Sequence, residues 1–385
     1  MRLDNGEPAP VLYGHLPTED VMHRPALALS LVLGLVLPAP ALAQIDGIPT
    51  PEEFAERAAA SERAPLFQSD EPLVIRLRTD IDFIRRERND SIEVEGTATF
   101  MDVDGSEVTR PVDVRARGEF RRSRDNCNFP PLRLDFPQGQ MDGTVFEGQN
   151  RLKLVTPCQD NRDDFQRYVI DEYLAYKVLN LLTPASNRVR LVEITYEDVN
   201  GRYDVRTKMG FLVEADERMA ERNRAVFLEA PQMHPMLADP DQAVITSTFN
   251  YMIGNTDWSA VFFHNAVVMR TEDGRHLTVP YDFDHAGVVN ARYATVDPSL
   301  ADRLRNVRQR LYRGYCLPQL DHATVAAVYN AQRDAITALY RDFPHYVDPD
   351  DGEDALDYYE GFWESIDDPG RFERNLVREC TEMPR

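Results

Sequence analysis

The sequence predicts an α+β fold of two lobes, with a sheet-rich N-terminal lobe over residues 71–215 and a mostly helical lobe over residues 216–385. Three observations support this prediction. The first half is dominated by short stretches in which apolar and polar residues alternate, as they do in half-buried strands. A single long stretch with helical periodicity lies near the end of that half. In the second half helical periodicity prevails, apart from one apolar hairpin.

The first 43 residues have the features of an export signal. Met22 begins the stretch MHRPALALSLVLGLVLPAPALAQ, in which a basic start precedes a short apolar run and an A-x-A ending. These are the parts of a cleavable secretory signal peptide, and the run is too short to be a transmembrane helix. We expect residues 1–43 to be removed, residues 44–70 to form a linker, and the mature chain to be secreted or periplasmic without an integral membrane span.

The chain has 385 residues and a formal net charge of −22. Such an acidic surface repels phosphate groups, which argues against nucleic acid as a partner. All four cysteines follow the predicted signal, and an even count in an exported chain predicts two disulfides. Three pairings are possible. We favour Cys127 with Cys158, because each lies beside one of two neighbouring predicted strands.

Seven stretches of the first half predict strands. They are residues 72–80, 91–105, 108–118, 131–136, 151–156, 188–198 and 203–214. Asp-Gly at residues 104–105 and Asn-Gly at residues 200–201 are strong signals for hairpin turns within this set. The N-terminal lobe should therefore be largely an antiparallel sheet.

Residues 163–182 predict the one helix of this lobe, because two aspartates suit its first turn and a proline follows its end. Glu172 has apolar neighbours whichever face of this helix docks, so its carboxylate needs a cationic partner. Lys153, in the strand before the helix, is the candidate. Further helical periodicity appears over residues 297–316 and 321–343 and around Tyr358.

The stretch NTDWSAVFFHNAVVMRTEDGRHLTVPYDFDHAG, residues 255–287, places polar groups at the ends of two apolar strands. Asp257 and Asn265 precede or enter the first strand, and Asp282 and Asp284 leave the second. Because a tight ribbon returns the chain to its start, Asn265 and Asp282 should become neighbours. Carboxylate and amide oxygens are the hard ligands that Mg²⁺ prefers.

The order of these features is that of protein kinases, in which a strand Lys pairs with a helix Glu and a catalytic Asp precedes a metal-binding Asn and Asp. It predicts Asp257 as the general base. It also predicts Asn265, Asp282 and Asp284 as metal ligands. The two lone histidines of the stretch, at positions 264 and 285, receive no role.

The same order predicts three residues that would bind the nucleotide. Lys153 would hold the phosphates, Glu172 would pair with Lys153, and Glu214 would lie near the hinge between the lobes.

Four blocks also resemble the spore coat protein H (CotH) kinase-like family. They are VRARGEFRRSRDNCNFPPLRLDF, RLKLVTPCQDNRDDFQRYVIDEYLAYKVLN, VRLVEITYEDVNGRYDVRTKMGFLVE, and IGNTDWSAVFFHNAVV through VPYDFDHAG, and together they span roughly residues 110–290. The resemblance implies a two-lobed, atypical protein-kinase-like fold. It also implies ATP between the lobes and Mg²⁺ or Mn²⁺ on the Asn and Asp side chains.

Three functions follow from these observations. The first is an exported kinase that transfers the γ-phosphoryl group of ATP to a hydroxyl of a protein substrate. The second is a CotH-like envelope or surface protein that binds without turnover, since Asn265 lies eight residues after Asp257 and not five as in the usual kinase loop. The third is a hydrolase that uses paired carboxylates. The sequence leaves open the phosphate acceptor and the oligomeric state.

Overall fold

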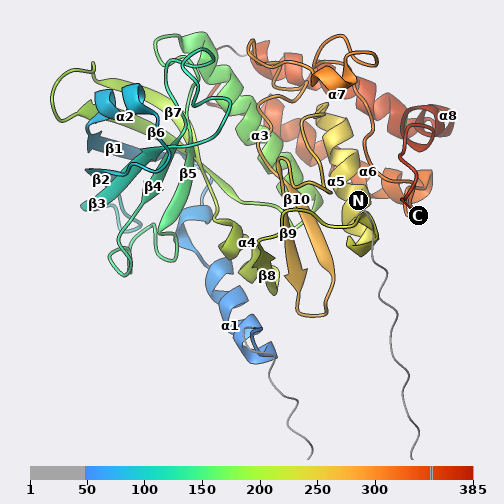
Figure 1. The fold of residues 1–385 in the computed structure, drawn as a ribbon, viewed down its shortest axis with the longest axis horizontal. Coiled ribbons are helices and arrows are strands. Elements are labelled where there is room, and N and C mark those ends of the chain that lie inside the picture. Colours follow the sequence, from blue (N-terminus) through green and yellow to red (C-terminus); the bar gives the residue numbers. More distant parts are fainter. Residues whose placement is uncertain (1–47, 347, 349, 385) are drawn as a thin grey trace, which may run out of the picture. The chain divides into compact units, whose positions relative to one another are not determined.

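The computed structural model describes residues 48–346, 348 and 350–384, so the predicted signal peptide and its cleavage site lie outside the described residues. Seven strands of the first half close into a barrel in the order β1-β2-β3-β4-β5-β7-β6 (Figure 1). Their bounds are β1 (Leu73–Thr79), β2 (Val94–Met101), β3 (Glu107–Ala116), β4 (Leu132–Asp135), β5 (Arg151–Val155), β6 (Val189–Asp198) and β7 (Arg206–Val213).

Barrel closure overturns the predicted fold class. β6 returns to pair with β1 in parallel, with Leu73 opposite Val192, while the other neighbouring strands are antiparallel. The two-lobed protein-kinase-like fold, with an antiparallel sheet as its first lobe, is therefore wrong. Alternating residues identify a strand but not its partner, and the closing pair joins strands that are more than a hundred residues apart in sequence.

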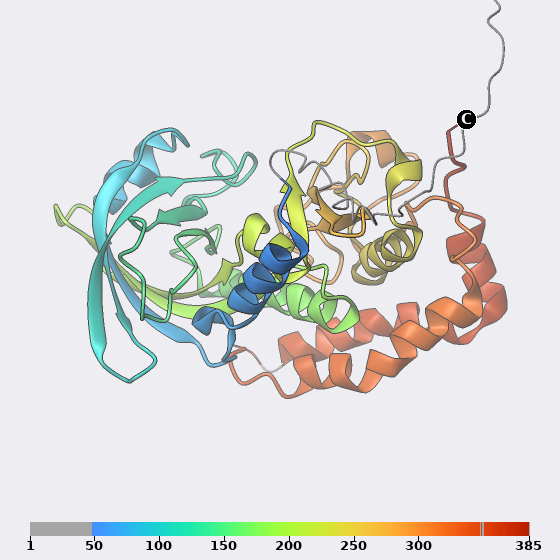
Figure 2. The same cartoon turned by 90° about the horizontal axis from the view of Figure 1, so that it is seen from below.

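Eight α-helices occur in the described part of the chain. They are α1 (Pro51–Glu62), α2 (Ile81–Glu87), α3 (Gln166–Leu182), α4 (Asp216–Arg222), α5 (Pro240–Ile253), α6 (His322–Arg341), α7 (Asp350–Asp367) and α8 (Pro369–Phe372). The predicted helix over residues 163–182 is confirmed as a short 3₁₀ turn (Asp163–Phe165) followed by α3. α3 contacts β6 and β7 of the barrel as well as α5 and α6, and α6 and α7 pack along each other (Figure 2).

Residues 297–316, predicted as a helix, form only a 3₁₀ turn at Pro298–Leu300. Contacts with other parts of the chain hold this segment in an irregular path. The guanidinium groups of Arg310 and Arg313 donate to backbone carbonyls of Met252 and Thr256, at the end of α5 and just after it. Tertiary contacts thus override the local periodicity.

A second, three-stranded sheet carries the predicted hairpin, with the order β10-β9-β8. β9 (Ala266–Thr271) and β10 (His276–Pro280) pair antiparallel with Ala266 opposite Pro280, which confirms the ribbon. β8 (Ala225–Leu228), which the sequence did not predict, adds to the far edge of β9.

Two disulfides, Cys127–Cys158 and Cys316–Cys380, confirm the predicted number and the favoured pairing. Such bonds fit an oxidising compartment outside the cytoplasm. Over the residues that the structure describes, no helix combines the length and the apolar character that a membrane span requires.

The centre of α3 carries a buried carboxylate, Asp171. Its two oxygens accept hydrogen bonds from Arg167 Nε, at 3.3 Å, and from the Tyr346 hydroxyl, at 2.7 Å. Arg167 also forms ion pairs with Asp351 and Asp354 of α7. Burial is the main cause that raises the pKa of Asp171, from 3.8 to about 7.

We expect this carboxyl group to make folding less favourable as the pH rises. Its pKa is higher in the folded chain than in the unfolded chain, so the advantage to the native state is complete below about pH 4. Between about pH 4 and pH 7 the native state holds a proton that the unfolded state has lost, and the advantage declines through this range until both states are ionised. The contribution of Asp171 to the free energy of unfolding should fall by about 2 kcal/mol between pH 5 and pH 7. Denaturant unfolding should therefore give a weaker pH dependence for Asp171→Asn than for the wild type. Asp354→Asn, a change at an exposed partner of Arg167, is the control, and equal slopes for wild type and Asp171→Asn would contradict the assignment.

Candidate active site

The loop after α5 fixes the position of Asp257. α5 ends at Gly254, whose φ of 68° is in the left-handed region and whose place leaves no room for a side chain beside the Tyr358 hydroxyl. The side chain of Asn255 then forms hydrogen bonds with one residue before it and one after it in the sequence. Its Nδ2 donates to Asn250 Oδ1 at 2.8 Å, and its Oδ1 accepts from the backbone amide of Asp257 at 3.0 Å.

Asp257 forms a compact polar group with two neighbours in sequence. Asn265 Nδ2 donates to the backbone oxygen of Asp257 at 2.8 Å and to its Oδ2 at 3.1 Å, and His264 Nε2 lies 2.8 Å from Oδ1. Asn265 has a φ of 47°, a left-handed conformation that Asn tolerates better than most residues. The structure thus brings Asp257 and Asn265 together as predicted, and it adds His264, for which no role was predicted.

The two aspartates after β10 are positioned by the residue between them. Phe283 is fully buried, with its ring centroid 4.6 Å from that of Tyr176 and 5.2 Å from that of Phe249. The backbone amide of Asp282 donates to the Tyr176 hydroxyl at 2.9 Å. These contacts of Phe283 and of the Asp282 backbone place both Asp282 and Asp284 beside one cation.

That cation is Arg121, which lies in the long connection between β3 and β4. Its guanidinium is 3.2 Å from Asp284 Oδ2, 3.4 Å from Asp282 Oδ1 and 3.5 Å from Glu172 Oε2, and its side chain is only 6% exposed. Burial opposes its charge, but the three carboxylates raise the pKa of Arg121 well above the ordinary value. Arg121 was not predicted as part of the site. The signal for it was the need of Glu172 for a cation, which pointed to any nearby basic residue and not to Lys153 alone.

The carboxylates around Arg121 carry more charge than one guanidinium offsets. Burial raises the pKa of Glu172 well above its ordinary value and also raises that of Asp284, to which Tyr293 donates a hydrogen bond. Neither oxygen of Glu172 has a hydrogen-bond partner among the residues that the structure describes. Three carboxylates share one cation, so the site favours a further positive charge.

A cavity of about 600 Å³ joins these groups into one site. Five residues singled out above line it: Asp257, His264, Asn265, Asp282 and Asp284. Arg117, Arg121 and His285 line it as well. Asp257 and Asp282 are each about one-third exposed, at 32% and 33% of their side chains, so both carboxylates can be reached from the cavity.

The structure does not bring Lys153 to Glu172. Lys153 Nζ lies 3.0 Å from Asp216 Oδ2, and it sits 4.8 Å from the centre of the Tyr281 ring. Tyr281 lines the cavity but Lys153 does not, so Lys153 is one residue removed from the site. The partner of Glu172 is Arg121 instead.

Glu214 is buried beyond the end of β7 in a network of hydrogen bonds. Its Oε2 accepts from the backbone amide of Arg188 at 2.9 Å and from Arg222 Nη2 at 3.0 Å. Both contacts serve packing between α4 and the start of β6. The predicted role of Glu214 in binding nucleotide has no support from its position.

The cavity presents a set of possible metal-ligand atoms, and a divalent cation needs several oxygens. Within the described ranges there is no group of three or more His, Cys, Asp or Glu side chains arranged to hold a metal ion. Asp282 and Asn265 supply one carboxylate and one amide oxygen at the cavity, which suffices for Mg²⁺ when phosphate oxygens and water complete its shell. Both aspartates contact Arg121, but the side chain of Asp284 is only 8% exposed, against 33% for Asp282, so Asp284 offers the cation little access. The residues therefore fit a cation that arrives with phosphates, rather than one held by the protein alone.

No protein-family model matches this chain, and no curated protein matches it either. The resemblance to the CotH kinase-like family therefore remains a hypothesis that depends on the residues of the hairpin. The function has to be inferred from the chemistry of the cavity.

Proposed function

We propose that the protein is an exported phosphotransferase that moves the γ-phosphoryl group of ATP to a hydroxyl group of a protein substrate. The observation that carries the proposal is the cavity in which Asp257, Asn265 and Asp282 lie together. An exposed carboxylate for the acceptor hydroxyl and hard oxygen donors for a cation are the groups that this reaction needs. The excess of carboxylates around Arg121 supports the binding of a divalent cation.

Asp257 is suited to accept the proton of the attacking hydroxyl. Asn265 and His264 hold its carboxylate, which faces the cavity. As the new bond from the hydroxyl oxygen to the γ-phosphorus forms, the bond to the bridging oxygen breaks, ADP leaves, and the proton passes to Asp257. Arg117 faces the same cavity and would contact phosphate oxygens.

Asn265 and Asp282 would hold Mg²⁺, which supplies charge neutralisation of the phosphates when bound. Arg121 contacts Asp282 from behind and keeps its carboxylate at the cavity. Arg121 is therefore a positioning residue rather than a catalytic one.

A second candidate is a protein that binds nucleotide without turnover. It is favoured by the pairing of Lys153 with Asp216, because in the described part of the chain the residues that line the cavity include no lysine to hold phosphates. We do not propose hydrolysis by Asp282 and Asp284, because both carboxylates are engaged by the same guanidinium.

The test uses the oxidised mature chain with γ-labelled ATP and Mg²⁺ or Mn²⁺. We expect thermal stabilisation by the metal nucleotide and incorporation of label into a protein substrate. Asp257→Asn should reduce incorporation by at least about a hundredfold and keep most of the stabilisation, because a general base acts in the transition state. Asp282→Ala should remove both effects.

Asp204→Asn is the matched control, since Asp204 is 93% exposed and does not line the cavity. Stabilisation without incorporation, for every variant and metal, would support the binding candidate. If no divalent metal and nucleotide shifts the melting temperature of the wild type, both candidates fail.

A further inference from the structure

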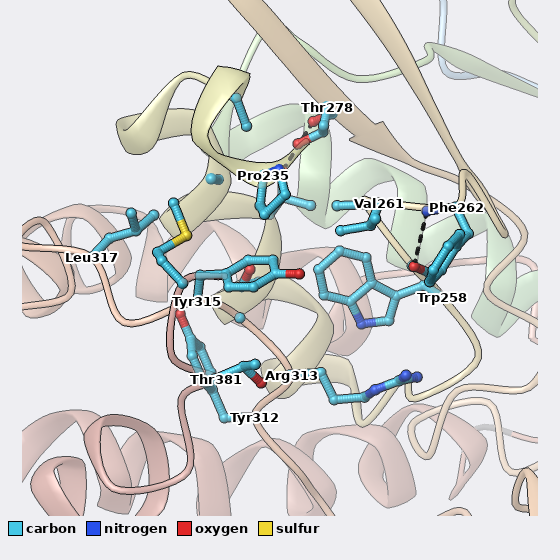
Figure 3. Close-up of a pocket in the computed structure, with 18 of the residues that line it drawn as sticks. Pro235, Trp258, Val261, Phe262, Thr278, Tyr312, Arg313, Tyr315, Leu317 and Thr381 are labelled. Carbon is cyan, nitrogen blue, oxygen red and sulfur yellow. Dashed lines mark hydrogen bonds between the residues drawn. The ribbon is translucent and has the colours of Figure 1, made fainter. Parts of the chain in front are cut away.

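A second cavity, of about 430 Å³, shares a loop with the proposed active site (Figure 3). Residues 258–262 line the second cavity, and residues 263–265 line the first. The backbone amide of Ser259 donates to the carbonyl of His264 at 2.8 Å, which closes this loop on itself. The two cavities therefore adjoin one short hairpin loop that begins directly after Asp257.

The wall between the cavities also contains Arg313. This residue lines the second cavity and donates to the backbone carbonyl of Thr256. Its charge is attracted by Asp297 and Asp257, which line the first cavity. A ligand in the second cavity would thus contact Trp258, the residue directly after the carboxylate that we assign as the base.

Aromatic and aliphatic residues make up most of the lining of the second cavity, and Arg303, Arg313 and Glu379 add charged groups to it. Figure 3 shows the rings of Trp258 and Tyr315 facing each other across it, with Val261 and Leu317 on its walls. Trp258 is only 4% exposed, and its Nε1 has no hydrogen-bond partner among the residues that the structure describes. In native proteins such a buried donor is commonly met by ordered water or by a ligand. Cavities of this size and composition bind apolar groups with one or two directed hydrogen bonds.

The segments that line the second cavity also expose large apolar residues. Met236, Leu237 and Phe262 are 68%, 57% and 69% exposed. The backbone amide of Met233 donates to the carbonyl of Val261 at 3.0 Å and joins the two segments that carry them. Exposed apolar residues around a cavity are typical of a surface that binds another protein. A free small metabolite, enclosed in the cavity, would not need them.

We infer that the second cavity binds an aromatic or large aliphatic side chain of the protein substrate, a few residues away from the hydroxyl that is phosphorylated. The inference rests on the proposed function for the role of the occupant, but the binding step can be measured without catalysis.

The chain has two tryptophans, so Trp363→Phe leaves Trp258, in the wall of the cavity, as the single tryptophan, and its emission is measured with excitation that tyrosine does not absorb. The probes are acetylated, amidated peptides with one Ser and one Phe at varied spacing, each matched to a peptide with Ala in place of Phe. We expect a saturable change in Trp258 emission for at least one Phe peptide, with a dissociation constant at least about tenfold below that of its Ala match. The same titration of the wild-type chain, with Trp363 as a constant background, guards against a folding defect of the variant.

Ala243→Leu fills the cavity from α5 and should weaken binding of the Phe peptide at least about tenfold, while stabilisation by the metal nucleotide is kept. Ala335→Leu, at an exposed position of α6, is the matched control and should change neither. Emission that no Phe peptide alters, or equal binding of Phe and Ala peptides, would overturn the inference.

Labelled ATP then separates this inference from the proposed function. Binding of a Phe peptide without incorporation of label would contradict phosphoryl transfer and keep the cavity as a peptide site. Equal incorporation into Phe and Ala peptides would keep phosphoryl transfer and contradict the cavity as a peptide site.

Discussion

Replacing Arg121 by Met is expected to lower the free energy of unfolding by about 3–5 kcal/mol at neutral pH, because removal of one partner from a buried ion pair leaves the other charge uncompensated. Arg121 is the cation shared by Glu172, Asp282 and Asp284, and it is almost entirely buried. Methionine keeps much of the side-chain volume, so the loss reports charge rather than packing. Denaturant unfolding followed by circular dichroism measures the effect.

The matched control is Arg76→Met. Arg76 pairs with Glu197 on the barrel surface and is 53% exposed, so its loss should cost less than about 1 kcal/mol. Adding Glu172→Gln to Arg121→Met should restore part of the stability, because it removes one of the carboxylates left unpaired. Equal losses for Arg121→Met and Arg76→Met would show that the cluster is not ionised in the folded protein.

Removal of the Cys127–Cys158 disulfide is expected to lower the free energy of unfolding by about 4 kcal/mol, from the loop entropy of its sequence separation of 31 residues. It should also weaken stabilisation by the metal nucleotide. The connection between β3 and β4 carries Arg121, and it is held at Cys127 by the disulfide. Arg88 holds it too, because its guanidinium donates to the carbonyls of Arg122, Cys127 and Asn128 at 3.1, 2.8 and 2.6 Å.

The double variant Cys127→Ala with Cys158→Ala should be compared with Cys316→Ala with Cys380→Ala. The second disulfide closes a longer loop, of 64 residues, so its loss should cost at least as much stability, again about 4 kcal/mol. It does not hold the Arg121 connection, so the shift with Mg²⁺-ATP should persist. Equal loss of the nucleotide shift in both double variants would contradict a specific role for Cys127–Cys158.

Local patterns predicted most of the secondary structure correctly. Alternation located the seven barrel strands, and the ribbon of β9 and β10 followed from one turn between two apolar runs. Closure of the barrel was beyond such reasoning, because it depends on a parallel pairing between strands that are distant in sequence. The irregular path of residues 297–316 was missed because its arginines bond to carbonyls near the end of α5.

In the candidate site, too, contacts within one local element could be predicted and contacts between distant segments could not. The grouping of Asp257 with Asn265, and their nearness to Asp282, could be predicted because a ribbon brings its own ends together. The partner of Glu172 could not be predicted, because Arg121 lies in a connection without periodicity, where sequence gives no direction for a side chain. Burial of Glu172 was the predictable part of that pair.

Closure of the barrel by β1 and β6 also sets an order of events for a chain that emerges from its N-terminus. β1 cannot pair with β6 until β6 has been made, more than a hundred residues later, and pairings of such long range form slowly. Until then the early strands form an open sheet whose exposed edge can pair with other chains. Cys127 and Cys158 both lie between β1 and β6 in the sequence, so their bond can form before the barrel closes. Oxidation would then shorten the loop between β1 and β6 and so speed their pairing. A reducing environment would prolong the period in which the unclosed sheet is prone to aggregate.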